Sequence, residues 1–281
     1  MLTLRLKLLL LNIRSFKLAK LSIQLPPLHT GRDGKGQVEI AEDSSRFKVV
    51  VCGRRYGKTT LGVVLCAKTG LEGGRAWWVA PTYPIASIGW RMLKVLASQI
   101  PDTEIREGDR EVIFPGGGVV QVKSADNPDS LRGEGLHGVV LDEVGQIRQI
   151  AWTDSLRPAL TDHKGWALFI GTPKGKNWLW DLFRRAKLAP NWRTWQKPTS
   201  DNPFIDPAEL EDAKLDLPLA VYRQEYEADF GASQLQVYDE FDREIHQWKS
   251  ELPQFDAFYG GLDFGGTTIG SHMSAGVLAG Y

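Results

Sequence analysis

The chain of 281 residues has little cysteine. It contains only Cys52 and Cys66, both in apolar surroundings, and no cluster of Cys and His with the spacing of metal ligands. This composition argues against a disulfide framework and indicates a reducing cytoplasm. The leucine-rich N-terminus also lacks a long apolar run, the longest there being Leu8–Leu11. That run is too short for a signal core or a membrane span, so we expect no membrane partner.

A surplus of either charge is missing as well, since 34 basic and 34 acidic residues cancel. A nucleic-acid partner must therefore be argued from where the charges lie and not from their total. Residues 1–22 carry basic residues among leucines and no acid. We interpret residues 1–27 as a tail. It is either an amphipathic helix that docks a partner, or residues added by an upstream start codon without a function of their own.

From Phe47 onward, β-rich runs alternate with helical stretches. The pattern predicts strands at Phe47–Val51 and Ala76–Ala80 and helices at Lys58–Ala67 and Ile85–Ser98. Alternation of strand and helix is typical of an α/β fold with a mainly parallel central sheet flanked by helices.

A different pattern interrupts this alternation between residues 103 and 124. Two short runs, Glu111–Phe114 and Gly118–Val122, are split by Pro115 and three glycines, which predicts a hairpin inserted beside the sheet. The alternation then resumes. The later elements that we expect are a strand at Gly138–Leu141, a helix from about Ile147, a strand at Ala167–Ile170 and a helix at Asn177–Ala186.

Residues 198–230 are acidic, helical and punctuated by proline. Asp206 and Pro207 mark one helix start, and Pro218 breaks the next element. We therefore divide the chain into a tail (1–27), a main domain (28–230), a polar linker (231–255) and a last segment (256–281), where a new run begins near Phe258.

The run Cys52-Gly53-Arg54-Arg55-Tyr56-Gly57-Lys58-Thr59 follows a predicted strand and opens a helix, the context of a phosphate-binding loop. In such a loop backbone N–H groups point at phosphate oxygens, the lysine reaches the β and γ phosphates of ATP, and the threonine hydroxyl ligates Mg²⁺. The expected nucleotide-binding residues are Gly53, Arg55, Tyr56, Gly57, Lys58, Thr59 and Thr60. Cys52 replaces the first glycine of the usual pattern, and the alternative is an ordinary strand-to-helix turn.

Two acids, Asp142 and Glu143, directly follow the apolar strand predicted at 138–141. At this place in an ATPase with a phosphate loop, Asp142 would hold Mg²⁺ and Glu143 would polarise the attacking water. Successive side chains diverge along a strand, so both tasks require the strand to end there, and Gly145 fits such an ending. The alternative is a pair of acids at a helix N-terminus.

Together with further segments, these motifs resemble the large terminase subunit of tailed bacteriophages, the ATPase that drives double-stranded DNA into a procapsid. The segments are the arginine-rich loop 53–59, Ser130–Gly135, Gly171–Gly175 and Asp201–Ile205, and the resemblance runs from about Leu28 to Tyr281. It implies a P-loop NTPase of the ASCE type.

The resemblance also implies individual roles. Gln37 would read adenine, because an amide can pair with both N6 and N7. Arg132 would reach the γ-phosphate of a neighbouring subunit, with Arg54 competing for that role. Thr172 would couple hydrolysis to movement. The alternatives are a solvated surface glutamine, a structural salt bridge and an ordinary turn residue.

Residues 174–197 combine basic side chains with Trp178, Trp180, Trp192 and Trp195. Cations for phosphate and aromatic rings for stacking favour a DNA-facing surface. The alternative is that the tryptophans belong to the core and the charges to a solvated face.

The stretch 259–265 resembles the first hairpin of the ribonuclease H-like nuclease domain of terminases, and Asp263 would be its first metal ligand. Cleavage by two metals needs further carboxylates, which this chain does not reach. We therefore expect a nuclease fragment and no endonuclease activity from the chain.

The sequence thus favours an ATP-hydrolysing packaging motor that uses ATP and Mg²⁺. Its expected partners are double-stranded DNA, a portal protein, a small terminase subunit and further copies in a ring, in the host cytoplasm and transiently docked on the procapsid portal. The alternatives are a helicase or repair-type ATPase and a nucleotide-binding fragment without turnover.

Overall fold

The computed structural model describes residues 25–231, 258–263 and 275–280. The chain divides into two compact units between Gln236 and Val237. The tail is described only from Leu25, and the linker lies almost wholly outside the described residues. For the last segment the structure describes two strands, β9 (Phe258–Asp263) and β10 (Ala275–Gly280), which pair antiparallel as a hairpin.

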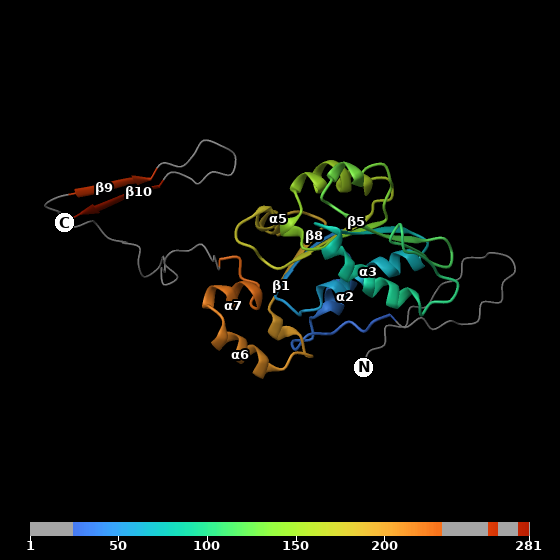
Figure 1. The fold of residues 1–281 in the computed structure, drawn as a ribbon, viewed down its shortest axis with the longest axis horizontal. Coiled ribbons are helices and arrows are strands. Elements are labelled where there is room, and N and C mark those ends of the chain that lie inside the picture. The colour runs from blue at the N-terminus through green and yellow to red at the C-terminus, as the bar shows by residue number, and fades with distance from the viewer. Residues whose placement is uncertain (1–24, 232–257, 264–274, 281) are drawn as a thin grey trace. The chain divides into compact units, whose positions relative to one another are not determined.

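The larger unit is built on one eight-stranded sheet (Figure 1). Its strands are β1 (Phe47–Cys52), β2 (Arg75–Ala80), β3 (Glu104–Arg106), β4 (Glu111–Ile113), β5 (Val119–Ser124), β6 (Gly138–Leu141), β7 (Trp166–Gly171) and β8 (Trp192–Lys197). They lie in the order β3-β4-β5-β2-β6-β7-β1-β8. From β5 to β8 every pairing is parallel, while β3 and β4 pair antiparallel. The predicted α/β fold with a mainly parallel sheet is confirmed.

Helical segments connect these strands. They are α1 (Gln37–Glu42), α2 (Lys58–Leu71), α3 (Tyr83–Ala97), η1 (Pro128–Leu131), η2 (Val144–Gln146), the π-helix η3 (Ala151–Leu156), α4 (Arg157–Ala159), α5 (Trp178–Ala186), η4 (Thr199–Asp201), α6 (Pro207–Asp216) and α7 (Leu219–Glu225). No helix in the described ranges has the length and apolarity that crossing a bilayer demands.

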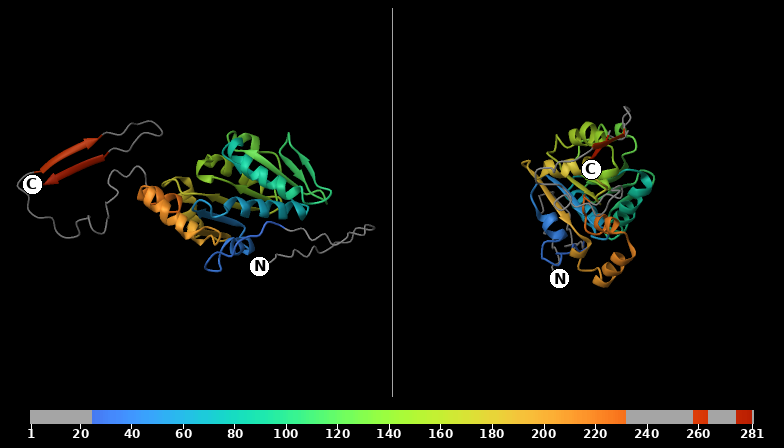
Figure 2. Two further views of the ribbon diagram at one scale, coloured as in Figure 1. Left: turned by 60° about the horizontal axis from the view of Figure 1, so that its bottom comes forward. Right: turned by 90° about the vertical axis from the view of Figure 1, so that its left-hand side faces the viewer.

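The sheet has a hydrophobic core on each face, because successive side chains of a strand point to opposite sides. In β1, Val50 packs with α2 and α3 on one face. Its neighbours Val49 and Val51 pack with η3 and α5 on the other face. Figures 1 and 2 show these helices on the two sides of the sheet. All six residues of β1 are buried, which explains its unbroken apolar sequence.

Local sequence signals set several boundaries. Asp206 caps α6, since its Oδ1 accepts a hydrogen bond from the N–H of Ala208 at 3.0 Å, and Pro207 fills the first helical position. Asn177 caps α5 in the same way, accepting from the N–H of Leu179 at 3.0 Å. Both predicted helix starts are confirmed.

Some predicted elements need correction. The hairpin β4–β5 exists, but it is part of the main sheet, because β5 pairs with β2 along its whole length. The helix expected from about Ile147 begins at Ala151 as a π-helix. The strand β8 was not predicted, and it pairs with all six residues of β1.

The DNA-stacking interpretation of the four tryptophans is also wrong. Trp195 is 6% exposed and belongs to the core beside α2. Trp178, Trp180 and Trp192 are partly buried and pack against the opposite core, where Trp192 stacks on Phe169 with ring centres 5.7 Å apart. Side chains fixed in this way anchor helix α5 and strand β8 to the sheet.

Candidate active site

Three neighbouring parallel strands, β6, β7 and β1, bring the predicted site residues to one edge of the sheet. The phosphate loop follows β1, Thr172 follows β7, and Asp142 follows β6. The carboxyl ends of parallel strands meet at one edge, so the spatial condition for a shared site is met. Strand β7 lies between the strand of the loop and the strand of the acids.

Two glycines of the loop are required by their surroundings. Gly57 caps α2 with φ +98°, a conformation that side-chain-bearing residues rarely adopt. Gly53 lies so close to Thr199 and Tyr226 that a Cβ atom there would come within 2.4 Å of each. The predicted strand–loop–helix context of the phosphate loop is therefore confirmed.

Lys58, the first residue of α2, extends back into the loop. Its Nζ lies 3.0 Å from the carbonyl oxygens of Cys52 and Gly53 and 3.2 Å from the hydroxyl oxygen of Thr172. The side chain is buried, and it is in no ion pair within the described part of the chain. A buried ammonium group held only by neutral oxygens is suited to an anionic ligand.

Asp142 and Glu143 lie where the sheet ends. Asp142 is 6% exposed, and burial together with the neighbouring carboxylate of Glu143 raises its pKa to about 7, while Lys58 acts in the opposite direction. Glu143 has φ +46° in the left-handed region, an uncommon conformation for a side-chain-bearing residue, and its N–H donates to Asp142 Oδ1 at 3.0 Å. The strand therefore ends between the two acids and their side chains diverge, as predicted.

The remaining residues of the loop differ in exposure. Thr59 and Thr60 are half-buried in the first turn of α2. Tyr56 is fully buried, its hydroxyl has no hydrogen-bond partner, and burial raises its pKa. Its ring therefore belongs to the core, and only its backbone can take part in binding phosphate. Arg55 is exposed, with φ +61°.

Gln37, the first residue of α1, lies against the loop. Its Nε2 donates to the carbonyl oxygen of Gly57 at 2.6 Å, and its Oε1 accepts from the N–H of His29 at 3.0 Å. Gln37 is 2% exposed, which excludes the alternative of a solvated surface glutamine. One N–H and one lone pair of the amide are left for another partner.

Arg54 lies on the outer side of the loop, next to acids from two directions. Its guanidinium forms an ion pair with Glu225 at the end of α7, and its N–H donates to the Glu225 carbonyl oxygen at 2.6 Å. That ion pair raises the pKa of Arg54, and Glu143 adds to the effect. Glu225 was not singled out in the sequence, where it is one acid in an acidic stretch.

A second group of residues holds the loop from outside. The amide of Asn202 donates to the carbonyl oxygen of Arg55 at 2.6 Å, and the hydroxyl of Thr199 donates to that of Arg54 at 2.7 Å. His29 donates from Nε2 to the carbonyl oxygen of Tyr56 at 2.8 Å. The segment 201–205 carried part of the resemblance, but its contact with the loop could not be predicted from the sequence.

Arg132 lies apart from these residues. Its guanidinium is 3.3 Å from Asp129, and its Nε is 3.4 Å from the hydroxyl of Ser155 in η3. The side chain is 54% exposed, so Asp129 and Ser155 leave much of it free. No hydrogen bond or ion pair within the described residues joins Arg132 to the phosphate loop of its own chain.

Asp263 is the last residue of β9 and pairs with Ala275 of β10. The structure describes its backbone only. Its proposed role as a metal ligand therefore stays a prediction.

Comparison with known proteins identifies the relatives of this chain. A family model described as terminase large subunit, T4likevirus-type, N-terminal, matches residues 49–245. The large terminase subunit of Escherichia phage T5 is 31% identical over 214 residues, which cover 74% of this chain and 49% of that protein. That of Thermus virus P23-45 is 32% identical over 251 residues, with 73% and 50% covered. The chain thus spans about half the length of these curated relatives.

Solved structures agree. The large terminase ATPase domain of Thermus phage P74-26 has a TM-score of 0.60 and 27% identity, and the match covers 69% of this chain and 92% of that one. The large terminase of a thermophilic bacteriophage, solved in complex with ADP, has a TM-score of 0.62 at 15% identity, which shows a shared fold, with 85% and 62% covered. By sequence and by structure, the chain belongs to the family of phage large terminase subunits.

Proposed function

We propose that this chain is the ATP-hydrolysing subunit of a phage DNA-packaging motor, with the ASCE type of P-loop fold. The observation that carries the proposal is the meeting of Lys58, Thr172 and Asp142 at one edge of the sheet, next to a loop with the glycines of a phosphate cradle. The family assignment supports the motor function, and the large terminase of the thermophilic bacteriophage has also been solved in complex with ATP-gamma-S.

The residues present fit a magnesium nucleotide. Lys58 is a buried cation without a carboxylate partner among the described residues, and Asp142 is a buried carboxyl group whose charged form burial disfavours. Each would gain the opposite charge from bound Mg²⁺ and triphosphate. Thr59 and Asp142 would hold Mg²⁺, which usually takes one or two protein oxygens in addition to phosphate. The ion would neutralise charge on the phosphate oxygens.

Glu143 is the proposed general base. Its carboxylate would take a proton from water as the water oxygen bonds to the γ-phosphorus and the bond to the β–γ bridging oxygen breaks. The left-handed backbone of Glu143 directs its side chain away from that of Asp142. One acid can therefore serve the ion while the other serves the water.

Two further residues complete the proposal. Gln37 would read adenine with the donor and acceptor that its contacts with Gly57 and His29 leave free. Arg132 would act on the nucleotide of a neighbouring copy, since it is exposed and makes no contact with its own phosphate loop. Thr172, in contact with Lys58, would sense the phosphate and couple its loss to movement.

In this proposal copies of the chain form a ring that acts on double-stranded DNA in the host cytoplasm, docked on a portal with a small terminase subunit. The hairpin β9–β10 would begin a ribonuclease H-like domain, with Asp263 as its first metal ligand. The strand pairing and the half-length match to the curated relatives support this assignment. An isolated copy without a neighbour's Arg132 could bind nucleotide without turning it over.

The test is ATP turnover of the chain and of Glu143→Gln. The substitution keeps shape and removes the base, so nucleotide binding should persist while turnover falls by about 10²–10⁴-fold. An unchanged rate would rule out Glu143 as the base.

A mixing experiment tests the role of Arg132. Arg132→Ala and Glu143→Gln subunits are each expected to be inactive alone. Mixed together, they should regain activity if the arginine acts on a neighbour, because one site then contains both groups. A mixture as inactive as its components would place the arginine's action within one chain.

A further inference from the structure

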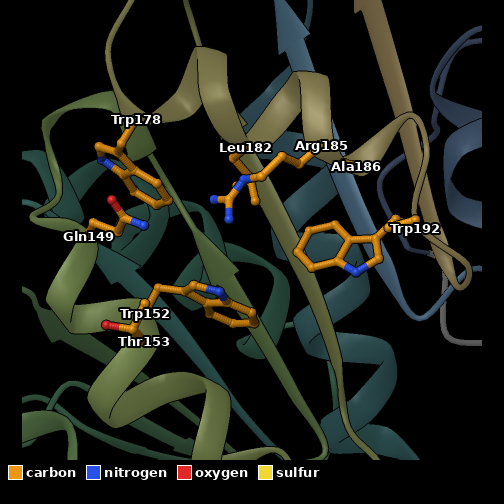
Figure 3. Close-up of a pocket in the computed structure, with 9 residues that line it drawn as sticks. Gln149, Trp152, Thr153, Trp178, Leu182, Arg185, Ala186 and Trp192 are labelled. Carbon is orange, nitrogen blue, oxygen red and sulfur yellow. The ribbon is translucent and has the colours of Figure 1, made fainter.

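One cavity of the larger unit has no role in the proposed site. It lies between η3, α5 and the start of β8, has a volume of about 240 Å³, and is walled by Trp152, Trp178 and Trp192 (Figure 3). The cavity is fixed in place, because Trp152 packs edge-on against Phe169 and Trp178 donates from Nε1 to the carbonyl oxygen of Ile147 at 2.6 Å. A rigid aromatic cavity of this size can take an apolar side chain.

Polar groups at the cavity favour an acidic occupant. The side chains of Arg185 and Gln149 point toward its interior in Figure 3. Arg185 is in no ion pair within the described part of the chain, its Nε donating only to the backbone oxygen of Asp181 at 3.4 Å. Further cations flank the cavity on α5 and β8, and none of them is in an ion pair within the described ranges. They are Arg184, Lys187 and Arg193.

The same chain exposes a surface of matching chemistry on α6. Leu215 is 87% exposed, an unusual position for a leucine in a short amphiphilic helix. Acidic side chains surround it, all of them exposed. They are Glu209, Glu211, Asp212 and Asp216, against the single base Lys214. No residue of α6 lines the cavity.

We propose that the tryptophan cavity of one copy receives Leu215 of a second copy, with the acids of α6 facing the cations around the cavity. The two surfaces are different parts of one molecule, so the contact is head-to-tail and can propagate into a ring. This inference deepens the proposed assembly and rests on it for the identity of the partner. It does not require ATP hydrolysis.

The contact fits the proposed place of Arg132. Helix η3 carries both Trp152 of the cavity and Ser155, which contacts Arg132. Helix α7, which follows α6, holds Arg54 of the phosphate loop through Glu225. Docking α6 on η3 would therefore bring the support of one copy's Arg132 next to the helices that hold its neighbour's phosphate loop.

Cross-linking of the full chain tests the contact. Thr153→Cys is at the cavity, Lys214→Cys is beside Leu215, and both positions are exposed. The native Cys52 and Cys66 are buried and should not react. With a short bismaleimide, a mixture of the two variants should give a covalent dimer that neither variant gives alone. Val95→Cys, 63% exposed on α3, replaces Lys214→Cys in the control mixture.

Two additions make the test specific. Leu215→Ser in the Lys214→Cys chain should lower the cross-linked fraction about tenfold, whereas Val95→Ser should not change it. Arg185→Glu should also lower it, and Asp212→Arg in the partner should restore it. High salt should weaken the contact.

Cross-linking no stronger than in the Val95→Cys control would overturn the proposal. If Arg185→Glu instead weakened binding of a single-stranded oligonucleotide and left cross-linking unchanged, the cavity would take nucleic acid and the proposed interface would be wrong. Neither result depends on ATP turnover, so failure here and failure of the proposed hydrolysis can be distinguished.

Discussion

The two ends of the central parallel strands are built differently. At the amino ends, polar groups have strong partners: Arg46 donates to the carbonyl oxygens of Gly165 at 2.8 Å and Leu160 at 2.9 Å, and Arg75 pairs with Glu134. At the carboxyl ends, Lys58 and Asp142 are buried without an oppositely charged partner at ion-pair distance in the described chain.

This difference separates fold from function. Satisfied polar groups fasten the amino edge, whereas the groups at the carboxyl edge are held at a cost to stability that a ligand would offset. Changes at the amino edge should therefore alter stability, and changes at the carboxyl edge should alter activity.

Two buried lysines of one strand–loop–helix unit give the largest expected contrast. Lys58→Ala should lower ATP turnover by about 10²–10³-fold, the usual effect of removing a group that stabilises transition-state charge. Lys48, in β1, donates from Nζ to the carbonyl oxygen of Ile40 at 2.7 Å. Lys48→Met should lower the free energy of unfolding by about 1–2 kcal/mol and leave the turnover of folded protein nearly unchanged. Equal losses of turnover in both variants would break the comparison.

The pKa of Asp142 gives a prediction of opposite sign for stability and activity. Because its pKa in the folded chain, about 7, is above the ordinary value of 3.8, folding is disfavoured where the unfolded group is charged, with the full cost above about pH 7. Asp142→Asn should therefore stabilise the nucleotide-free chain at pH 8 by roughly 1–3 kcal/mol, while turnover is lost. Denaturant unfolding at pH 8 and pH 5 measures the effect, which should shrink at pH 5. A loss of stability at pH 8 would contradict this account.

How much of this could be predicted from the sequence differs between elements. The strands β1, β6 and β7 and the residues after them were predicted because long apolar runs end in glycines and charged residues. Strand β8 was missed because Trp192–Lys197 reads as amphipathic and basic, and only its pairing with β1 makes it a strand. The hydrogen bond from Asn202 to the loop joins residues 147 positions apart, and no local pattern encodes such a contact.

The smallest expected effect lies at the amino edge, where His137 and His163 stack with ring centres 3.9 Å apart. Burial, then His163 and Arg75, lowers the pKa of His137. A base with a lowered pKa binds fewer protons in the folded state, so its contribution to stability is complete above about pH 6.5 and is lost as the pH falls below it. The free energy of unfolding should fall by less than about 1 kcal/mol for this residue, and the pH dependence should be weaker in His137→Asn. Turnover of the folded protein should not follow this substitution.

The central claim is that Thr59 and Asp142 hold one magnesium nucleotide between them. A double-mutant cycle on Mg²⁺-dependent ATP binding tests it most directly, with Thr59→Ala, Asp142→Asn and the combination of both measured by titration calorimetry. If the two side chains hold the same ion, either substitution removes most of the Mg²⁺ dependence and the second adds little. Fully additive losses would show that they serve separate sites, and the account would be wrong.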